Sequence, residues 1–142
     1  MTQFTVDEFR KAFKGDIVSE GDPDYDAAID RWATNAVRRA KFVAFVKDAE
    51  DVALALKYAR ASGLPIAVRG GGHSASGASS VEGGLVIDLS RHLKDVTVDP
   101  ERKLAFLRGG AVWLTVDETT MKYGLATVAG TISHVRSFSA LA

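Results

Sequence analysis

"RGGGHSASGASSVEGG", which runs from Arg69 to Gly84, is the stretch that decides the fold of this chain. It contains three consecutive glycines and four serines, and a single histidine, His73, follows the glycines. Glycine adopts backbone angles that are closed to other residues and lets the main chain approach a ligand closely. The stretch therefore predicts a loop, and the segments on either side of it indicate where that loop lies.

A strand, a helix and a second strand precede the loop in the predicted order. The run "KFVAFV" (residues 41–46) is typical of a buried strand, and Asp48 can cap a helix that Gly63 ends. Pro65 then introduces the short apolar strand "IAVR" (residues 66–69). This order predicts a βαβ unit with parallel strands, which places the loop at the carboxyl end of a strand, where open sheets bind ligands.

A third strand, a hairpin and a helix are expected after the loop. "GLVIDL" (residues 84–89) predicts a third buried strand, and "VTVD" with "KLAFLRGG" predicts a hairpin whose turn is "PERK" (residues 100–103). A helix is expected from Trp113 to Tyr123, closed by Gly124. The predicted class is α+β with an α/β-like start: a βαβ unit and its glycine-rich loop lead into antiparallel strands.

Composition limits the kinds of partner. The chain has 142 residues, 18 basic and 18 acidic, and no cysteine. A net charge of zero without a basic block argues against nucleic acid or an anionic membrane surface as a partner. The absence of cysteine excludes disulfides and thiolate metal sites. The N-terminal residues lack the apolar core of a signal peptide, so a cytoplasmic location is the default expectation.

The glycine-rich loop has two interpretations on chemical grounds alone. Exposed main-chain N–H groups suit phosphate oxygens, but a mobile surface loop has the same composition. The chain lacks the GxxxxGK[ST] motif, and no helix-forming run follows the loop as a dinucleotide GxGxxG motif requires. His73 is either an ordinary loop histidine or a functional one. A metal site is not expected there, because His92 and His134 are distant in the sequence.

Several separate blocks resemble one enzyme group. They are "LPIAVRGGGHS", "GLVIDLS", "RGGAVW" and "GLATVAGTISH", in this order between Trp32 and His134. The chain resembles the N-terminal part of the PCMH-type FAD-binding domain of the vanillyl-alcohol oxidase and p-cresol methylhydroxylase group. Within that group it looks most like the berberine-bridge-like and hydroxynicotine-oxidase-like FAD-linked oxidases. The resemblance implies an FAD-dependent oxidoreductase.

The resemblance also implies which residues contact the cofactor. The loop from Gly70 to Gly77 would wrap the FAD diphosphate, and the positive charge of Arg69 would favour the negative charge of the cofactor. His73 would be the candidate for covalent attachment to the flavin. A second stretch that includes Ala129 would pass close to the flavin. The implied FAD-binding residues are Arg69, Gly70, Gly71, Gly72, His73, Ser74, Gly77, Val128, Gly130, Thr131 and Ser133. No catalytic residue and no metal ligand are assigned.

The resemblance ends after His134, where "VRSFSALA" stands in place of the family's glycine-rich run. We expect an N-terminal helical segment over residues 1–35, a partial FAD-binding domain over 36–134 and a divergent tail over 135–142. The tail is interpreted as translated intron, as a truncation or as divergence.

Several side chains are expected to have structural roles. Thr5 and Glu8 predict a capping box at the first helix, and Tyr25, Ile29 and Trp32 are expected to anchor the N-terminal segment to the body. Leu56 belongs to the predicted apolar face of the helix that Asp48 caps. Asp88 is expected to cap or turn its strand end, and Trp113 to pack its helix onto the sheet.

The substrate domain, which carries the catalytic base in the family, has no counterpart in this chain. The expected function is the FAD-binding part of an oxidase, truncated and inactive alone, with a small-molecule substrate only in a full-length form. The alternative is a non-catalytic flavin- or nucleotide-binding module or an inactive remnant.

Overall fold

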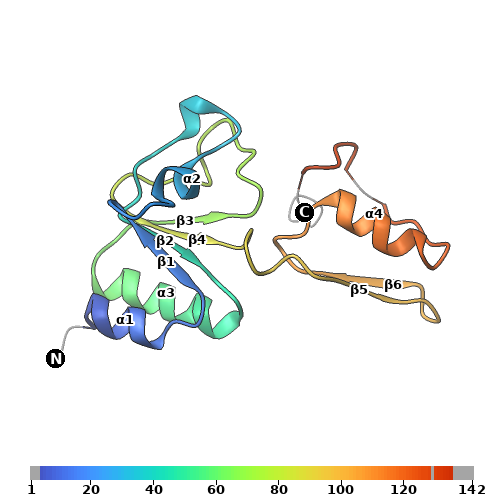
Figure 1. Cartoon of the computed structure of the whole chain (residues 1–142), viewed down its shortest axis with the longest axis horizontal. Coiled ribbons are helices and arrows are strands. Elements are labelled where there is room, and N and C mark those ends of the chain that lie inside the picture. The colour runs from blue at the N-terminus through green and yellow to red at the C-terminus, as the bar shows by residue number, and fades with distance from the viewer. Residues whose placement is uncertain (1–3, 129, 136–142) are drawn as a thin grey trace.

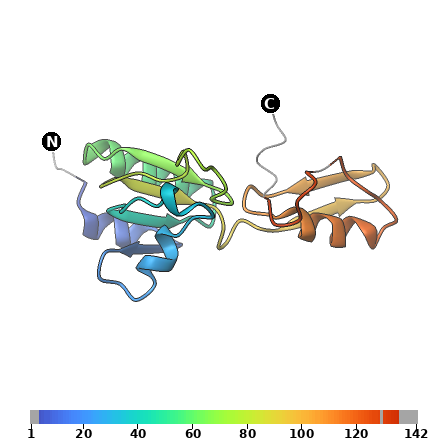
Figure 2. The ribbon, with the colours of Figure 1, turned by 90° about the horizontal axis from the view of Figure 1, so that it is seen from above.

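The computed structural model describes residues 4–128 and 130–135 and has two lobes side by side (Figure 1, Figure 2). The sheet lobe (residues 4–90) is built on a four-stranded sheet, and the hairpin lobe (residues 95–135) on a two-stranded one. The connection between them follows the last strand of the larger sheet. The predicted class, a mixed α/β start that leads into an antiparallel hairpin, is confirmed.

The four-stranded sheet has the order β1-β2-β4-β3. Its strands are β1 (Asp16–Ser19), β2 (Phe42–Phe45), β3 (Ile66–Arg69) and β4 (Leu85–Asp88). β2 and β3 were predicted to be parallel to each other, and both pair in parallel with β4, which lies between them. β1 pairs with β2 in the antiparallel direction and was not predicted. Only two consecutive apolar residues, Ile17 and Val18, mark it in the sequence, so no alternation indicates a strand.

Helices cover both faces of this sheet. α1 (Val6–Ala12) and α3 (Ala49–Ala61) lie on one face, and the short α2 (Tyr25–Ile29) lies on the other, followed by a 3-10 turn, η1 (Thr34–Ala36). The alternation along β2 divides its side chains between the two hydrophobic clusters. The capping box that Thr5 and Glu8 predict for α1 is confirmed.

The core on the α1 and α3 face is aromatic. The rings of Phe9 and Tyr58 stack with centroids 4.5 Å apart and planes 6° apart. Phe9 is in α1 and Tyr58 in α3, so this contact joins the two helices. The other face buries Tyr25 and Ile29 of α2. Both were predicted to anchor the N-terminal segment, and both do so.

Asp51 has a larger role than its place in the first turn of α3 predicts. Asp48 caps that helix as expected, and its Oδ1 accepts from the Asp51 N–H at 3.0 Å. The Asp51 carboxylate is fully buried and accepts from the main-chain N–H groups of Lys14, Gly15 and Lys47 at 2.9, 3.1 and 2.9 Å. It therefore links the turn between α1 and β1 to the start of α3.

The hairpin lobe contains β5 (Val96–Asp99), β6 (Leu104–Leu107) and α4 (Trp113–Met121). The hairpin, its turn and the helix were predicted and are confirmed. Trp113 is buried, as expected, whereas Val128 and the neighbouring described residues form neither helix nor strand. In the described ranges, no helix combines the length and the apolar character needed to cross a membrane.

Two expected core contacts are absent. Trp32 was predicted to anchor the N-terminal segment, but 67% of its surface is exposed. Leu56 was predicted to lie on the apolar face of α3, but it is exposed. The core of α3 instead uses the positions of Ala55, Tyr58 and Ala59. Trp32 has a different partner, which lies in the glycine loop.

Candidate functional site

The glycine loop runs from Gly70, directly after β3, to Gly84, directly before β4. It contains no helix or strand, so the predicted loop after a parallel strand is confirmed. In the described part of the chain, no hydrogen bond is donated by the main-chain N–H groups of Gly70, Gly71, Gly72, His73, Ser74, Ala75 and Ser76. A run of unpaired donors of this kind suits negatively charged oxygens.

Gly72 is the position in the loop where glycine is required. Its φ is +73°, in the left-handed region, and it is buried. A Cβ atom there would lie 3.1 Å from Cδ of Arg31 and 3.2 Å from Nε of Arg69. Both the backbone angle and the close contact therefore disfavour a side chain. Gly77, with φ of +82°, takes the same backbone conformation further along the loop.

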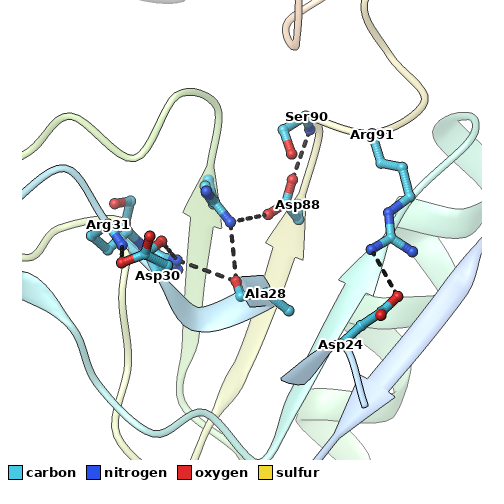
Figure 3. A network of polar contacts seen from close by, with 9 residues as sticks. Asp24, Ala28, Asp30, Arg31, Asp88, Ser90 and Arg91 are labelled. Atoms are coloured by element: carbon cyan, nitrogen blue, oxygen red, sulfur yellow. Dashed lines mark hydrogen bonds and ion pairs between the residues drawn. The ribbon is translucent and has the colours of Figure 1, made fainter. Parts of the chain in front are cut away.

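An ion pair between the partly buried Arg69 and the fully buried Asp88 lies at the carboxyl ends of β3 and β4. Arg69 and Asp88 are opposite each other in the register, and Nη1 of Arg69 donates to Oδ2 of Asp88 at 3.1 Å and to the Ala28 carbonyl at 3.0 Å (Figure 3). The second carboxylate oxygen of Asp88 accepts from the Ser90 N–H at 2.7 Å, which is the strand-end role predicted for it. Nε of Arg69 is buried and has no hydrogen-bond partner among the described residues.

Arg31 adds a second buried cation beside this pair. It is 5% exposed, and its Nε and Nη2 donate to the carbonyl oxygen of Ser79 at 3.3 and 2.8 Å. Nη1 donates to the carbonyls of Ala28 and Asp30 at 3.3 and 2.6 Å. Burial, followed by the charge of Arg69, lowers the pKa of Arg31 to about 10.

Two arginines and two aspartates lie close together here. Within the described residues Arg31 has no carboxylate at ion-pair distance, whereas Arg69 has Asp88. The charges of Asp88 and Asp30 both act on Arg31, and only the Asp88 carboxylate is buried. An open pocket of about 360 Å³, lined by Asp30, Arg31, Trp32 and Arg69, reaches the two guanidinium groups from the surface.

His73 is held between an aromatic ring and a carbonyl group. Its imidazole stacks on Trp32 with centroids 5.0 Å apart and planes 21° apart. Its Nε2 lies 3.0 Å from the carbonyl oxygen of His134. A carbonyl only accepts hydrogen bonds, so Nε2 carries the proton, and in the neutral ring the lone pair is on Nδ1.

The histidines do not form a metal site in the described part of the chain. Although 61 residues separate His73 from His134, the fold brings them together, which their distance in the sequence had not indicated. The contact uses the main chain of His134, and no group of three or more metal-binding side chains occurs among the described residues. His92 is bonded to Asp16 at 2.7 Å instead.

The second predicted stretch lies on the hairpin lobe and is open to solvent. Val128, Gly130, Thr131 and Ser133 are all exposed. A Cβ atom on Gly130 would lie 2.8 Å from Nε1 of Trp113, and the Ser133 carbonyl accepts from Leu114 at 2.9 Å. Ala129 lies outside the described residues, as does the predicted tail beyond residue 135. The contact of His134 with His73 brings the end of this stretch to the loop.

Arg31 was not identified from the sequence. Its contact with Ser79 joins residues 48 positions apart, and no local spacing indicates it. The exposed stacking position of Trp32 was likewise not predicted, because a tryptophan in a mixed segment is typical of a core contact.

Comparison with known proteins identifies the family. The profile of a family described as "FAD binding domain" matches residues 40–137. The chain belongs to this FAD-binding family. The predicted PCMH-type domain and the relationship to FAD-linked oxidoreductases are thereby confirmed.

Two curated relatives illustrate the match of this member of the FAD-binding family. It is 40% identical over 121 residues to the uncharacterized FAD-linked oxidoreductase YgaK of Bacillus subtilis, covering 85% of the chain and 27% of the relative. It is 32% identical over 119 residues to (R)-6-hydroxynicotine oxidase of Paenarthrobacter nicotinovorans, covering 84% and 26%. The chain thus spans about a quarter of the length of these relatives.

Solved structures agree with the fold. The crystal structure of 6-hydroxy-D-nicotine oxidase from Arthrobacter nicotinovorans superposes with a TM-score of 0.84 at 31% identity, covering 88% of this chain and 27% of that one. A BBE-like protein of Physcomitrella patens gives 0.83 at 21% identity, covering 93% and 29%, which is a likeness of fold. The chain corresponds to the N-terminal part of the FAD-binding domains in these structures.

Proposed function

We propose that this chain holds FAD through its glycine loop, as part of an FAD-linked oxidoreductase. The observation that carries the proposal is the run of N–H groups from Gly70 to Ser76, unpaired within the described residues, beside the guanidinium groups of Arg31 and Arg69. A diphosphate brings negative charge and several acceptor oxygens, and both are complementary to such a surface.

The residues present fit an anionic group on two further counts. Nε of Arg69 is a buried donor that has no partner in the part of the chain that the structure describes. The main chain at Gly72 lies so close to Arg31 and Arg69 that a side chain would crowd both guanidinium groups. We propose that Arg69, Gly70, Gly71, Gly72, His73, Ser74 and Gly77 contact FAD on the loop side, and Val128, Gly130, Thr131 and Ser133 on the other. When bound, FAD would supply the redox chemistry as acceptor of two electrons from a substrate.

His73 is our candidate for covalent attachment. A neutral imidazole needs a free lone pair to form such a bond, and the hydrogen bond from Nε2 to the His134 carbonyl leaves that lone pair on Nδ1. The chain contains no cysteine, so a link formed by these residues is a single one.

Oxidation of a substrate is a property we propose only for a longer protein. The relatives are about four times as long as the matched segment, and no catalytic base is assigned within these 142 residues. An oxidase needs acid–base groups and a pocket that excludes water at the reacting carbon. We therefore expect the 142-residue chain to bind FAD without oxidising small molecules at a useful rate.

The test compares the chain with His73→Ala after incubation with FAD. We expect wild type to give a fluorescent flavin band on a denaturing gel and His73→Ala to give none, while both retain FAD under native filtration because the loop contacts persist. His92→Ala, which removes the imidazole bonded to Asp16, is the matched control and should keep the band. A band of equal intensity in His73→Ala would exclude the attachment role. Failure of wild type to retain FAD would contradict the binding function itself.

A further inference from the structure

Two adjacent residues contact the glycine loop at two separate points. The main-chain N–H of Trp32 donates to the Gly72 carbonyl at 3.3 Å, near the start of the loop. The Arg31 guanidinium donates twice to the Ser79 carbonyl, near its end. The segment between Gly72 and Ser79 is therefore bounded on both sides by one dipeptide.

Arg31 is itself fixed to the sheet lobe. Its remaining guanidinium nitrogen, Nη1, donates to the carbonyls of Ala28 and Asp30, at the end of α2. The planar guanidinium has its donors in a rigid fork, so it holds the Ser79 carbonyl and the end of α2 in one relative position. Because only 5% of Arg31 is exposed, its side chain can adopt few other orientations.

The loop needs such a restraint. Glycine loses more conformational freedom on ordering than any other residue, and this loop has three in succession. Within the described residues, no main-chain N–H from Gly70 to Ser76 donates a hydrogen bond that would order them. A loop that is already fixed binds a ligand more tightly, because the entropy of ordering is not lost at the binding step.

Trp32 adds a restraint on His73. It is 67% exposed and thus contributes little to the core, yet its ring lies flat against the imidazole at 5.0 Å. An exposed tryptophan in this position is explained by the contact with His73 and not by burial.

We propose that Arg31 and Trp32 form a clasp that fixes the glycine loop and the His73 ring before a cofactor binds. Both are positioning residues. The benefit to FAD binding rests on the function proposed above, but the clasp acts in the chain without FAD. Order in the loop can therefore be measured independently of cofactor binding.

The experiment uses ¹⁵N relaxation on the FAD-free chain, whose 15.2 kDa mass suits NMR. Arg31→Lys keeps the charge but replaces the three-nitrogen fork with one nitrogen, which cannot hold Ser79 and α2 together. We expect the order parameters of residues 71–78 to be about 0.8 in wild type and below about 0.6 in Arg31→Lys. Those of β4 should stay at about 0.85 in both proteins. Arg10→Lys is the control, since Arg10 also bonds a main-chain carbonyl, that of Ile17, but not the loop. Equal loop order in Arg31→Lys and wild type would overturn the proposal.

Trp32→Leu provides a second measurement that does not depend on a buried residue. Loss of the stacked indole should shift the His73 ring proton resonances downfield. The imidazole ring should also sample a wider range of orientations, while the fold is retained. Unchanged His73 resonances would contradict the clasp. FAD affinity is then measured separately: we expect about tenfold weaker binding in Arg31→Lys, equivalent to about 1.4 kcal/mol. If the loop loosens but wild type itself does not bind FAD, the clasp stands and the proposed function fails.

Discussion

The two lobes differ in how much of each sheet is covered. In the sheet lobe, helices pack on both faces and every residue of β4 is buried. In the hairpin lobe, α4 packs against β5, while Leu104 and Phe106 of β6 are exposed. Isolated two-stranded sheets are marginally stable in water, whereas a covered four-stranded sheet has a core of its own.

This difference divides the candidate FAD site. The glycine loop is continuous with β3 and β4 of the covered lobe, and Arg31 ties it to α2. The stretch from Val128 to Ser133 belongs to the open lobe and is exposed. We infer that the loop side of the site depends on the stability of the sheet lobe, and the following predictions test that dependence.

The largest effect is expected from a matched pair of leucines, each the first residue of its strand. Leu85 in β4 is 0% exposed and Leu104 in β6 is 42% exposed. Leu85→Ala should lower the free energy of unfolding by about 2–5 kcal/mol, because it removes buried methyl groups and leaves a cavity. Leu104→Ala should cost less than about 1 kcal/mol. Urea unfolding followed by circular dichroism measures both, and similar losses at the two positions would refute the contrast between the lobes.

Asp51→Asn should have the next largest effect. The amide retains one acceptor oxygen where the carboxylate now accepts from three N–H groups, so buried donors lose partners. We expect a loss of about 2–4 kcal/mol, since each buried unsatisfied group costs about 1–3 kcal/mol. Glu50→Gln is the control, because Glu50 is adjacent in the chain and exposed. Equal stability of Asp51→Asn and wild type would show that these three bonds do not hold the α1–β1 turn.

The smallest effect concerns pH at the edge of the sheet lobe. The hydrogen bond from His92, then that from Arg91, lowers the pKa of Asp16 below its ordinary value of 3.8. Because the folded pKa is lower than the unfolded one, the stabilisation is present above pH 3.8 and is lost as pH falls below it. Asp16 is partly exposed, so the contribution is about 0.5 kcal/mol. The stability difference between wild type and Asp16→Asn should therefore shrink between pH 6 and pH 3, and a constant difference would argue against the linkage.

Local patterns in the sequence predict those features that depend on neighbours. Gly63 marks the end of α3 and Pro65 the start of β3, because each restricts or frees its own backbone. The capping box at Thr5 depends only on Glu8, three residues further on. The glycine loop was predicted for the same reason. These features need no knowledge of the rest of the fold.

Features that depend on distant partners were not predicted. β1 is a strand because β2 lies beside it, and the Asp51 network joins residues up to 37 positions apart. The contacts of Arg31 with Ser79 and of His73 with His134 span 48 and 61 positions. The family resemblance indicated the loop and His73, but no pattern indicated the residues that hold them in place.

The position of β4 has a consequence for the order of folding. Since β4 lies between β2 and β3, those two strands have no direct partner in each other, and the parallel sheet closes only when β4 inserts. During synthesis, residues 1–83 therefore contain two strands with open edges until β4 emerges. The glycine loop connects β3 to β4, so we expect the loop to form and the sheet to close in the same kinetic step. Contacts between residues far apart in the sequence form slowly, and we expect the nascent chain to be most prone to aggregation just before β4 emerges.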